Sequence, residues 1–116
     1  MSVQPIHGPE LIPRPAQTPL ALYEAVAALM PDRLAEMTAD QARAMTEAVQ
    51  GQSLKPLLRF TTKWAVDVEI ARHPKTLAEL HRAEYLANHA QSLQERRRQA
   101  ALAGAIASAA AEAVRE

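Results

Sequence analysis

The distribution of proline constrains this chain more than any other feature of its sequence. Five of the eight prolines lie within the first nineteen residues, and none follows Pro74. Proline has no backbone N–H and disfavours helix at the residue before it, so residues 1–17 should form a disordered, flexible arm. The forty-two residues after Pro74 contain a single glycine, Gly104, and are rich in helix-forming residues. They should therefore be almost entirely helical.

The segment after the arm carries the signals of a first helix. Thr18 is a good N-cap residue, and Pro19 stands where the first helical position would be. We expect this helix to run over about 19–29 and to end before Pro31. A short turn or helix over 32–37 should follow it.

A capping box predicts the next helix. Thr38 and Gln41 have the spacing at which threonine caps a helix and glutamine bonds back to the cap. The helix should cover about 39–50 and stop at Gly51, because glycine readily adopts the left-handed conformation of a helix end. The residues expected to face the core from it are Ala42, Met45 and Val49.

Residues 54–72 fit two structures. As a helix, they place Trp64 on a broad apolar face. As a strand, residues 64–70 would alternate between apolar and polar side chains. A lone strand needs a partner to bond its backbone groups, and a second subunit could supply one, as in ribbon-helix-helix dimers. In such a dimer Asp67 and Glu69 would face a DNA groove, where the phosphates would repel their carboxylates. The helix is therefore favoured.

The last helix should be long. Thr76 and Glu79 form a second capping box, and helix-favouring residues continue from there, which predicts a helix over about 76–114. Whether it is continuous through 94–98 stays open. The sequence predicts an all-α fold in which residues 18–116 form one domain, a compact bundle of short helices closed by the long C-terminal helix. The expected core residues are Leu22, Val26, Leu29, Met45, Val49, Leu57, Phe60, Trp64, Val68, Leu80 and Leu86.

The C-terminal helix has a heptad-like pattern of apolar and small residues, which is typical of helices that pair. Small side chains let two helices approach closely, so we expect a tight antiparallel or homodimeric pairing. Arg97 falls on the seam, where it would either fix the register by meeting a carboxylate or interrupt the seam. The predicted partner-binding residues are Leu86, Leu93, Arg97, Ala100, Leu102, Gly104, Ile106, Ala107 and Val114.

The residue types and their spacing argue against an enzyme. There is no cysteine, and the chain has no glycine-rich phosphate loop, zinc-protease motif or Ser-His-Asp spacing. We therefore predict no catalytic residues and no cofactor. His81 and Glu84 are one helical turn apart and would suit the edge of a metal site, but a solvated helix face is the simpler interpretation, so no metal is predicted either.

The charge balance does not point to nucleic acid or anionic membranes as partners. Thirteen basic and thirteen acidic side chains give a net charge of zero. The alternative of a nucleic-acid-binding regulator rests on one basic run and a nearby arginine, namely Arg82, Arg96, Arg97 and Arg98. The most apolar stretch, over 100–114, is shorter than the about 20 residues of a membrane-spanning helix. With no signal-peptide pattern at the start, we expect a cytoplasmic protein.

The stretch from Ser53 to Ala65 contains the block Leu54-Lys55-Pro56-Leu57, with Trp64 several residues later. Over about residues 39–72 the chain resembles a family of small helical actinobacterial proteins of unknown function, some of which are found beside toxins of the RelE/ParE type. The resemblance implies an antitoxin-like or regulatory binding role and no known catalytic residues. Together with the helical pattern, it predicts a non-enzymatic module that binds a protein partner or itself.

Overall fold

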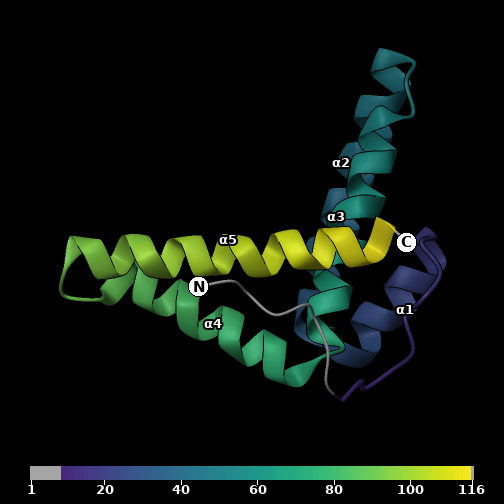
Figure 1. Cartoon of the computed structure of the whole chain (residues 1–116). Coiled ribbons are helices and arrows are strands. Elements are labelled where there is room, and N and C mark those ends of the chain that lie inside the picture. Colours follow the sequence, from purple (N-terminus) through teal and green to yellow (C-terminus); the bar gives the residue numbers. More distant parts are fainter. Residues whose placement is uncertain (1–8, 116) are drawn as a thin grey trace.

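The computed structural model describes residues 9–115, which contain five α-helices, one short 3₁₀ helix and no strand (Figure 1). The elements are α1 (Pro19–Leu29), η1 (Pro31–Arg33), α2 (Leu34–Gly51), α3 (Lys55–Ala71), α4 (Pro74–His89) and α5 (Leu93–Arg115). The all-α prediction is confirmed. Residues 64–70 lie within α3 and are helical. Residues 1–8, the first part of the expected arm, lie outside the described residues.

The helices form two hairpins that meet at α3. Helices α4 and α5 run antiparallel and side by side, while α2 and α3 form a second hairpin whose tip projects away from the rest of the fold (Figure 1). Helix α1 packs near the base of this second hairpin. Because α3 contacts each of the other four α-helices, the core is built around it.

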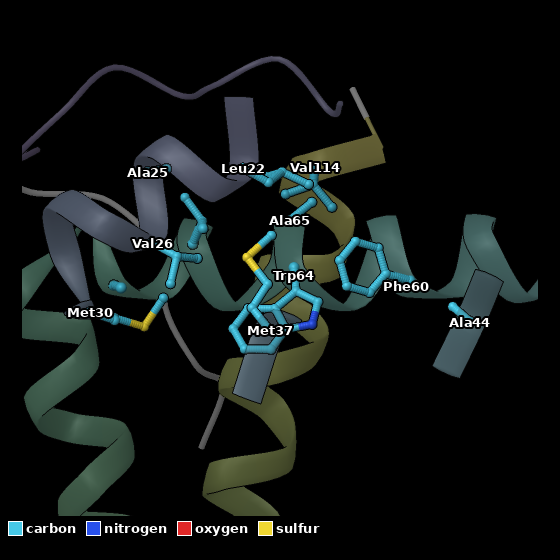
Figure 2. Packing of buried hydrophobic residues seen from close by; sticks show 12 residues of the cluster. Leu22, Ala25, Val26, Met30, Met37, Ala44, Phe60, Trp64, Ala65 and Val114 are labelled. Carbon is cyan, nitrogen blue, oxygen red and sulfur yellow. The ribbon is translucent and has the colours of Figure 1, made fainter. Parts of the chain in front are cut away.

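Trp64, in the middle of α3, occupies the centre of the main core (Figure 2). Its side chain is fully buried, and Val26 of α1, Met37 of α2 and Val114 of α5 belong to the same cluster. The prediction that Trp64 is central is therefore confirmed. A smaller cluster joins α3 to the α4–α5 hairpin and consists of Ile70, Ile106 and Ala110.

Most of the expected core residues lie in the interior. The buried ones are Leu22, Val26, Phe60, Trp64 and Val68, and the half-buried ones are Leu29, Leu57, Leu80 and Leu86. The first helix also has its predicted bounds. Thr18 caps α1 by accepting a hydrogen bond from the backbone N–H of Ala21 at 3.2 Å, and Pro19 is its first residue.

Helix α2 buries a different face from the one that its sequence predicts. Met45 and Val49 are 49% and 69% exposed, and Ala42 is exposed as well. The buried side chains of α2 are Met37, Ala44 and Ala48. The two small alanines let α2 approach α3 closely. Met45 and Val49 follow them by one residue, which is roughly 100° further round the helix, so their side chains face solvent.

The two ends of α2 also differ from the prediction. The helix begins at Leu34 and runs through Thr38, so Thr38 lies inside the helix and does not cap it. At the other end Gly51 is the last helical residue. The left-handed conformation belongs to Gln52, with φ of 49°, whose N–H bonds back to carbonyls of the last turn.

The expected helix over 76–114 is two helices that fold back on each other. The break lies at residues 90–92, before the 94–98 segment considered from the sequence. Ala90 is extended, and the Ser92 hydroxyl accepts a hydrogen bond from the Glu95 N–H at 3.0 Å, which caps α5. Arg96 reinforces the turn by donating to the Ala90 carbonyl at 3.2 Å. The two halves of the expected helix thus pair with each other within one chain. The predicted seam is not the contact they use, because Leu93, Arg97, Ala100, Gly104 and Ala107 are exposed.

Replacing Ser92 with alanine should lower the free energy of unfolding by about 1 kcal/mol, because a backbone donor of α5 loses its partner. Urea denaturation followed by circular dichroism measures this change. Ser108 is a suitable control, since it is an exposed serine within the same helix; Ser108→Ala should change stability by less than about 0.5 kcal/mol. Equal losses in the two variants would show that Ser92 does not stabilise the turn.

Residues 9–17, which we call the strap, contain no helix or strand, but they do not extend freely from the core as expected. Leu11 donates its N–H to the carbonyl of Arg72 at 2.8 Å. Ile12 packs against the main core, and Arg14 forms an ion pair with Glu69 on α3. Opposite charges on the strap and at the end of α3 therefore hold this part of the chain in place.

Candidate functional site

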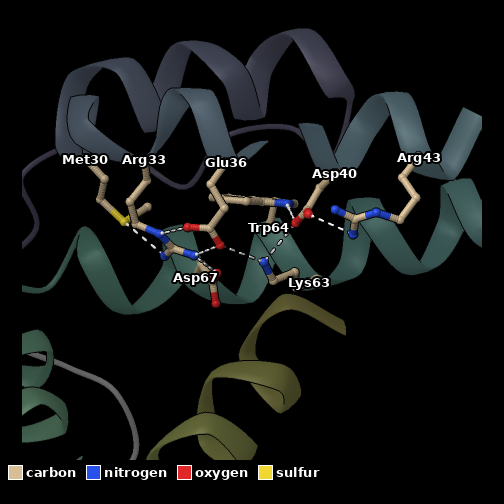
Figure 3. Close-up of polar contacts among 8 residues, drawn as sticks. All are labelled: Met30, Arg33, Glu36, Asp40, Arg43, Lys63, Trp64 and Asp67. Atoms are coloured by element: carbon tan, nitrogen blue, oxygen red, sulfur yellow. Dashed lines mark hydrogen bonds and ion pairs between the residues drawn. The ribbon is translucent and has the colours of Figure 1, made fainter. Parts of the chain in front are cut away.

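The first polar cluster lies between α2 and α3, around the indole ring of Trp64 (Figure 3). The indole N–H donates to Asp40 Oδ2 at 3.2 Å. The ammonium of Lys63 lies 4.2 Å and the guanidinium carbon of Arg33 4.6 Å from the ring centre. Both cations therefore interact with the aromatic face, which links the polar cluster directly to the core.

The carboxylates of this cluster are paired with the same two cations. Hydrogen bonds from Arg33 at 2.9 Å and Lys63 at 3.3 Å lower the pKa of Glu36 to about 2. A hydrogen bond from Lys63 at 3.0 Å likewise lowers the pKa of Asp40. Burial raises the pKa of Asp67, although Arg33 donates to it at 3.1 Å. Glu36 and Asp40 are thus ionised and paired at neutral pH, so they tie α2 to α3 and are poor proton donors.

The second polar cluster is buried beneath the strap at the end of α3. Glu69 is only 1% exposed and receives two hydrogen bonds from Arg72, at 2.9 and 3.1 Å. Arg14 of the strap adds two more, at 2.9 and 3.2 Å. Arg72 also pairs with Glu10 of the strap at 3.0 Å. Within residues 9–115 neither ring nitrogen of His73 makes a hydrogen bond, although Nε2 lies 3.4 Å from Glu69.

The environment of Glu69 favours its charged form. Burial by itself raises the pKa of this carboxyl, but the hydrogen bonds from Arg72 and Arg14 outweigh it and lower the pKa to about 2. A hydrogen bond to Glu69 in turn raises the pKa of Arg72. A carboxylate held by two guanidinium groups is a weak base, so this cluster holds the strap against α3 and is unsuited to acid–base catalysis.

A cleft of about 510 Å³ lies between the end of α1, η1, α3 and α4. Leu29, Ile70 and Leu80 are among its apolar lining residues, and His81 and Glu84 also line it. This is where the structure places the two residues considered as the edge of a metal site. Among residues 9–115, no three histidine, aspartate or glutamate side chains come together in a group that could hold a metal ion.

The predicted partner-binding residues fall on two different faces of the α4–α5 hairpin. Ile106 and Val114 are buried in the core, and Leu86 and Leu102 are half-buried. The exposed ones are Leu93, Arg97, Ala100, Gly104 and Ala107. The large apolar side chains are mostly used inside the fold, and the free face of α5 carries mainly small residues.

The arginines of the nucleic-acid alternative are divided as well. Arg82, Arg97 and Arg98 are exposed, and Arg96 is half-buried. Arg96 donates to the turn at Ala90, and Arg98 pairs with Glu95 one turn earlier. Arg97 is paired with no carboxylate among residues 9–115, so it does not set a register within this structure. Two of the three arginines in the run therefore stabilise the start of α5.

The tip of the α2–α3 hairpin carries the main concentration of exposed apolar side chains. Nine large hydrophobic residues are exposed within the described chain, and four of them lie here. They are Met45 (49% exposed), Val49 (69%), Leu54 (70%) and Leu58 (62%). With half-buried Leu57 they form what we call the hairpin-tip patch. A groove of about 330 Å³ is lined by every member of this patch except Leu58, and none of its lining residues is charged.

The sequence contains a signal for this patch, but the same signal also predicts a buried core face. Met45 and Val49 are spaced i, i+4, and Leu54 and Leu58 repeat that spacing on the other side of the turn. Such pairs predict a buried face when a helix is considered alone. Only the burial of Ala44 and Ala48 where α2 packs on α3 shows that the larger side chains are left outside.

Within residues 9–115, no helix has both the length and the apolar character needed to cross a membrane. Comparisons with protein-family models, with curated proteins and with solved structures find no match to this chain. The resemblance to the actinobacterial family therefore stays a prediction. The candidate site rests on the geometry of the hairpin-tip patch.

Proposed function

We propose that this protein is a non-enzymatic interaction module that binds another protein chain through the hairpin-tip patch. The observation that carries the proposal is the gathering of Met45, Val49 and Leu54, each between 49% and 70% exposed, around one groove of the α2–α3 hairpin. Leu58, 62% exposed, follows Leu54 by one turn. Exposed apolar residues are usually scattered singly, and a contiguous group of them is typical of a contact surface.

The size of the patch supports a specific contact. Fully burying one side chain of this kind contributes about 1.5–3 kcal/mol. Covering the exposed half or more of four such residues would then contribute roughly 4–8 kcal/mol before the cost of association is subtracted. The absence of charge in the groove lining means that the contact would depend little on ionic strength.

A non-enzymatic role is supported by how the polar clusters are used. Glu36, Asp40 and Glu69 are each held by cations from the same chain, which leaves these carboxylates committed to structure. We keep a regulatory, antitoxin-like role as the proposed biological setting. The proposed binding surface differs from the one expected from the sequence, because the face of α5 left exposed carries mainly small residues.

Photo-crosslinking in the host cell tests the proposal. A photoreactive amino acid at position 49 should give a discrete crosslinked product, because Val49 would be covered by the bound chain. Position 20 is the matched control, since Leu20 is 68% exposed on α1 and lies outside the patch. Products at position 49 and none at position 20 are expected. Failure of both positions, or equal labelling by both, would overturn the proposal.

A further inference from the structure

We propose that the cleft between α1, η1, α3 and α4 binds a small organic cation, namely an ammonium group on a short hydrocarbon chain. The volume of the cleft, about 510 Å³, lies within the range of roughly 300–1,000 Å³ that is usual for small-molecule sites. It shares no lining residue with the hairpin-tip patch, so the two surfaces can be tested independently.

The apolar part of the lining would hold the hydrocarbon chain. It consists of Leu29, Met30, Ile70, Leu77 and Leu80. All five are buried or half-buried, and they pack against the two core clusters of the fold. This surface is therefore already ordered before a ligand arrives, which reduces the cost of binding. Covering it with a hydrocarbon chain removes apolar area from water, which favours binding.

The polar part of the lining carries more negative than positive charge. Its carboxylates are Asp32, Asp67 and Glu84, and against them stands one guanidinium, that of Arg33. Arg33 also donates to Glu36 at 2.9 and 3.0 Å, so part of its charge is used outside the lining. Within residues 9–115, Asp32 and Glu84 form no ion pair. A cation in the cleft would thus meet carboxylates that the described chain leaves unpaired.

Asp67 is the carboxylate that a bound cation would help most. Its side chain is only 24% exposed, and Arg33 donates to it at 3.1 Å (Figure 3). Burial nevertheless raises the pKa of Asp67, so one shared guanidinium does not fully replace the water that the carboxylate has lost. A ligand ammonium would supply a second charged donor.

The lining suits an organic cation better than a metal ion. Among residues 9–115, no three histidine, aspartate or glutamate side chains come close enough to hold a metal, so the compact set of ligands that a metal needs is missing there. The apolar lining residues offer a metal ion no ligand, whereas they favour a hydrocarbon chain. His81 also lines the cleft, and a neutral imidazole nitrogen can accept a hydrogen bond from an ammonium group.

Isothermal titration calorimetry with hexylamine on the full-length chain tests the proposal. Hexylamine should bind at low millimolar concentration or below. Hexan-1-ol has the same hydrocarbon chain without the charge and should bind at least about tenfold more weakly. Butylamine has two fewer methylene groups and should also bind about tenfold more weakly than hexylamine.

Variants that change only the charge of the cleft sharpen the test. Asp32→Asn combined with Glu84→Gln should weaken hexylamine binding more than about tenfold and leave hexan-1-ol binding unchanged. His81→Lys, which adds a competing cation, should weaken hexylamine binding as well. The three side chains are exposed, so circular dichroism should show unchanged helix content. Glu79→Gln is the control, because Glu79 is exposed on α4 but does not line the cleft, and it should bind like the wild type.

Methyl NMR locates the bound probe. Hexylamine should shift the methyl signals of Ile70 and Leu80 and leave those of Val49 and Leu54 in place. Shifts confined to the hairpin-tip patch would overturn the proposal, as would equal affinity for hexylamine and hexan-1-ol. Two further results would also contradict it: no hexylamine binding at tens of millimolar, or binding that both charge variants leave unchanged.

Discussion

Replacing Trp64 with alanine should lower the free energy of unfolding by about 3–5 kcal/mol. The side chain is fully buried at the point where α1, α2, α3 and α5 meet, so its removal leaves a large cavity that several helices would have to fill. A small domain has a total stability of only about 5–15 kcal/mol. The variant should therefore be partly unfolded at moderate temperature.

The polar contacts of Trp64 add to this effect. Alanine would remove the hydrogen bond to Asp40 and the aromatic surface beneath Lys63 and Arg33. Trp64→Phe separates the two contributions, because it keeps an aromatic ring and most of the apolar volume but lacks the indole N–H. We expect it to lose clearly less stability than Trp64→Ala.

Urea denaturation followed by far-ultraviolet circular dichroism measures both variants, since the only tryptophan is removed in each. Tyr23→Ala is the control for loss of an aromatic side chain, because Tyr23 is 43% exposed on α1. Its effect should stay below about 1 kcal/mol. A Trp64→Ala protein with the unfolding midpoint of the wild type would contradict the core described here.

The position of Trp64 was predictable because several local signals agree on it. Residues 54–72 have one broad apolar face, and a strand at 64–70 would have lacked a partner. The first helix was predictable for a similar reason, since Thr18, Pro19 and Pro31 mark its ends. In both segments the local sequence and the tertiary contacts favour the same structure.

The buried face of α2 and the position of the break before α5 were not predicted, because two patterns compete in each place. Ala44 and Ala48 have the same i, i+4 spacing as Met45 and Val49, and larger apolar residues are the natural choice for a core. The contact with α3 instead selects the small pair. Ser92 and Glu95 have the spacing of a capping box, but strong helix formers on both sides obscure it.

The attachment of the strap could not be read from any local pattern. Arg14 and Glu69 are 55 residues apart in the sequence, and the Ile12 carbonyl accepts a hydrogen bond from Arg72, 60 residues away. Periodicity reports which side chains share a face of one element, and it contains no information about which distant charges meet. The hairpin-tip patch was missed for the related reason that exposure depends on how helices pack.

Replacing Glu69 with glutamine should lower the free energy of unfolding at neutral pH by about 3 kcal/mol. Hydrogen bonds from Arg72 and Arg14 outweigh burial and lower the pKa of Glu69 to about 2, whereas its ordinary value is 4.5. This difference corresponds to about 3 kcal/mol of stability in the charged state. Glutamine would also leave the buried guanidinium of Arg72 without its closest counter-charge.

Glu36→Gln is the matched control for this variant. Hydrogen bonds from Arg33 and Lys63 lower the pKa of Glu36 to about 2 as well, but its side chain is 48% exposed. Solvent screens an exposed ion pair, so the same chemical change should cost less than about 1 kcal/mol there. Equal losses in the two variants would contradict the idea that burial gives the Glu69 pair its strength.

The pH dependence of stability provides a second test of Glu69. The pKa of Glu69 is lower in the folded chain than in the unfolded chain, so the folded state binds fewer protons at this group. The stabilisation that Glu69 provides is therefore present above about pH 4.5 and is lost as the pH falls toward 2. Wild-type stability should fall across this window, and Glu69→Gln should reduce the slope. The part of the slope that comes from Glu36 and Asp40, whose pKa values are also lowered, should remain. Hydrogen exchange at Leu11, whose N–H bonds to Arg72, should become faster in the same variant. An unchanged slope together with unchanged exchange would show that Glu69 does not hold the strap against α3.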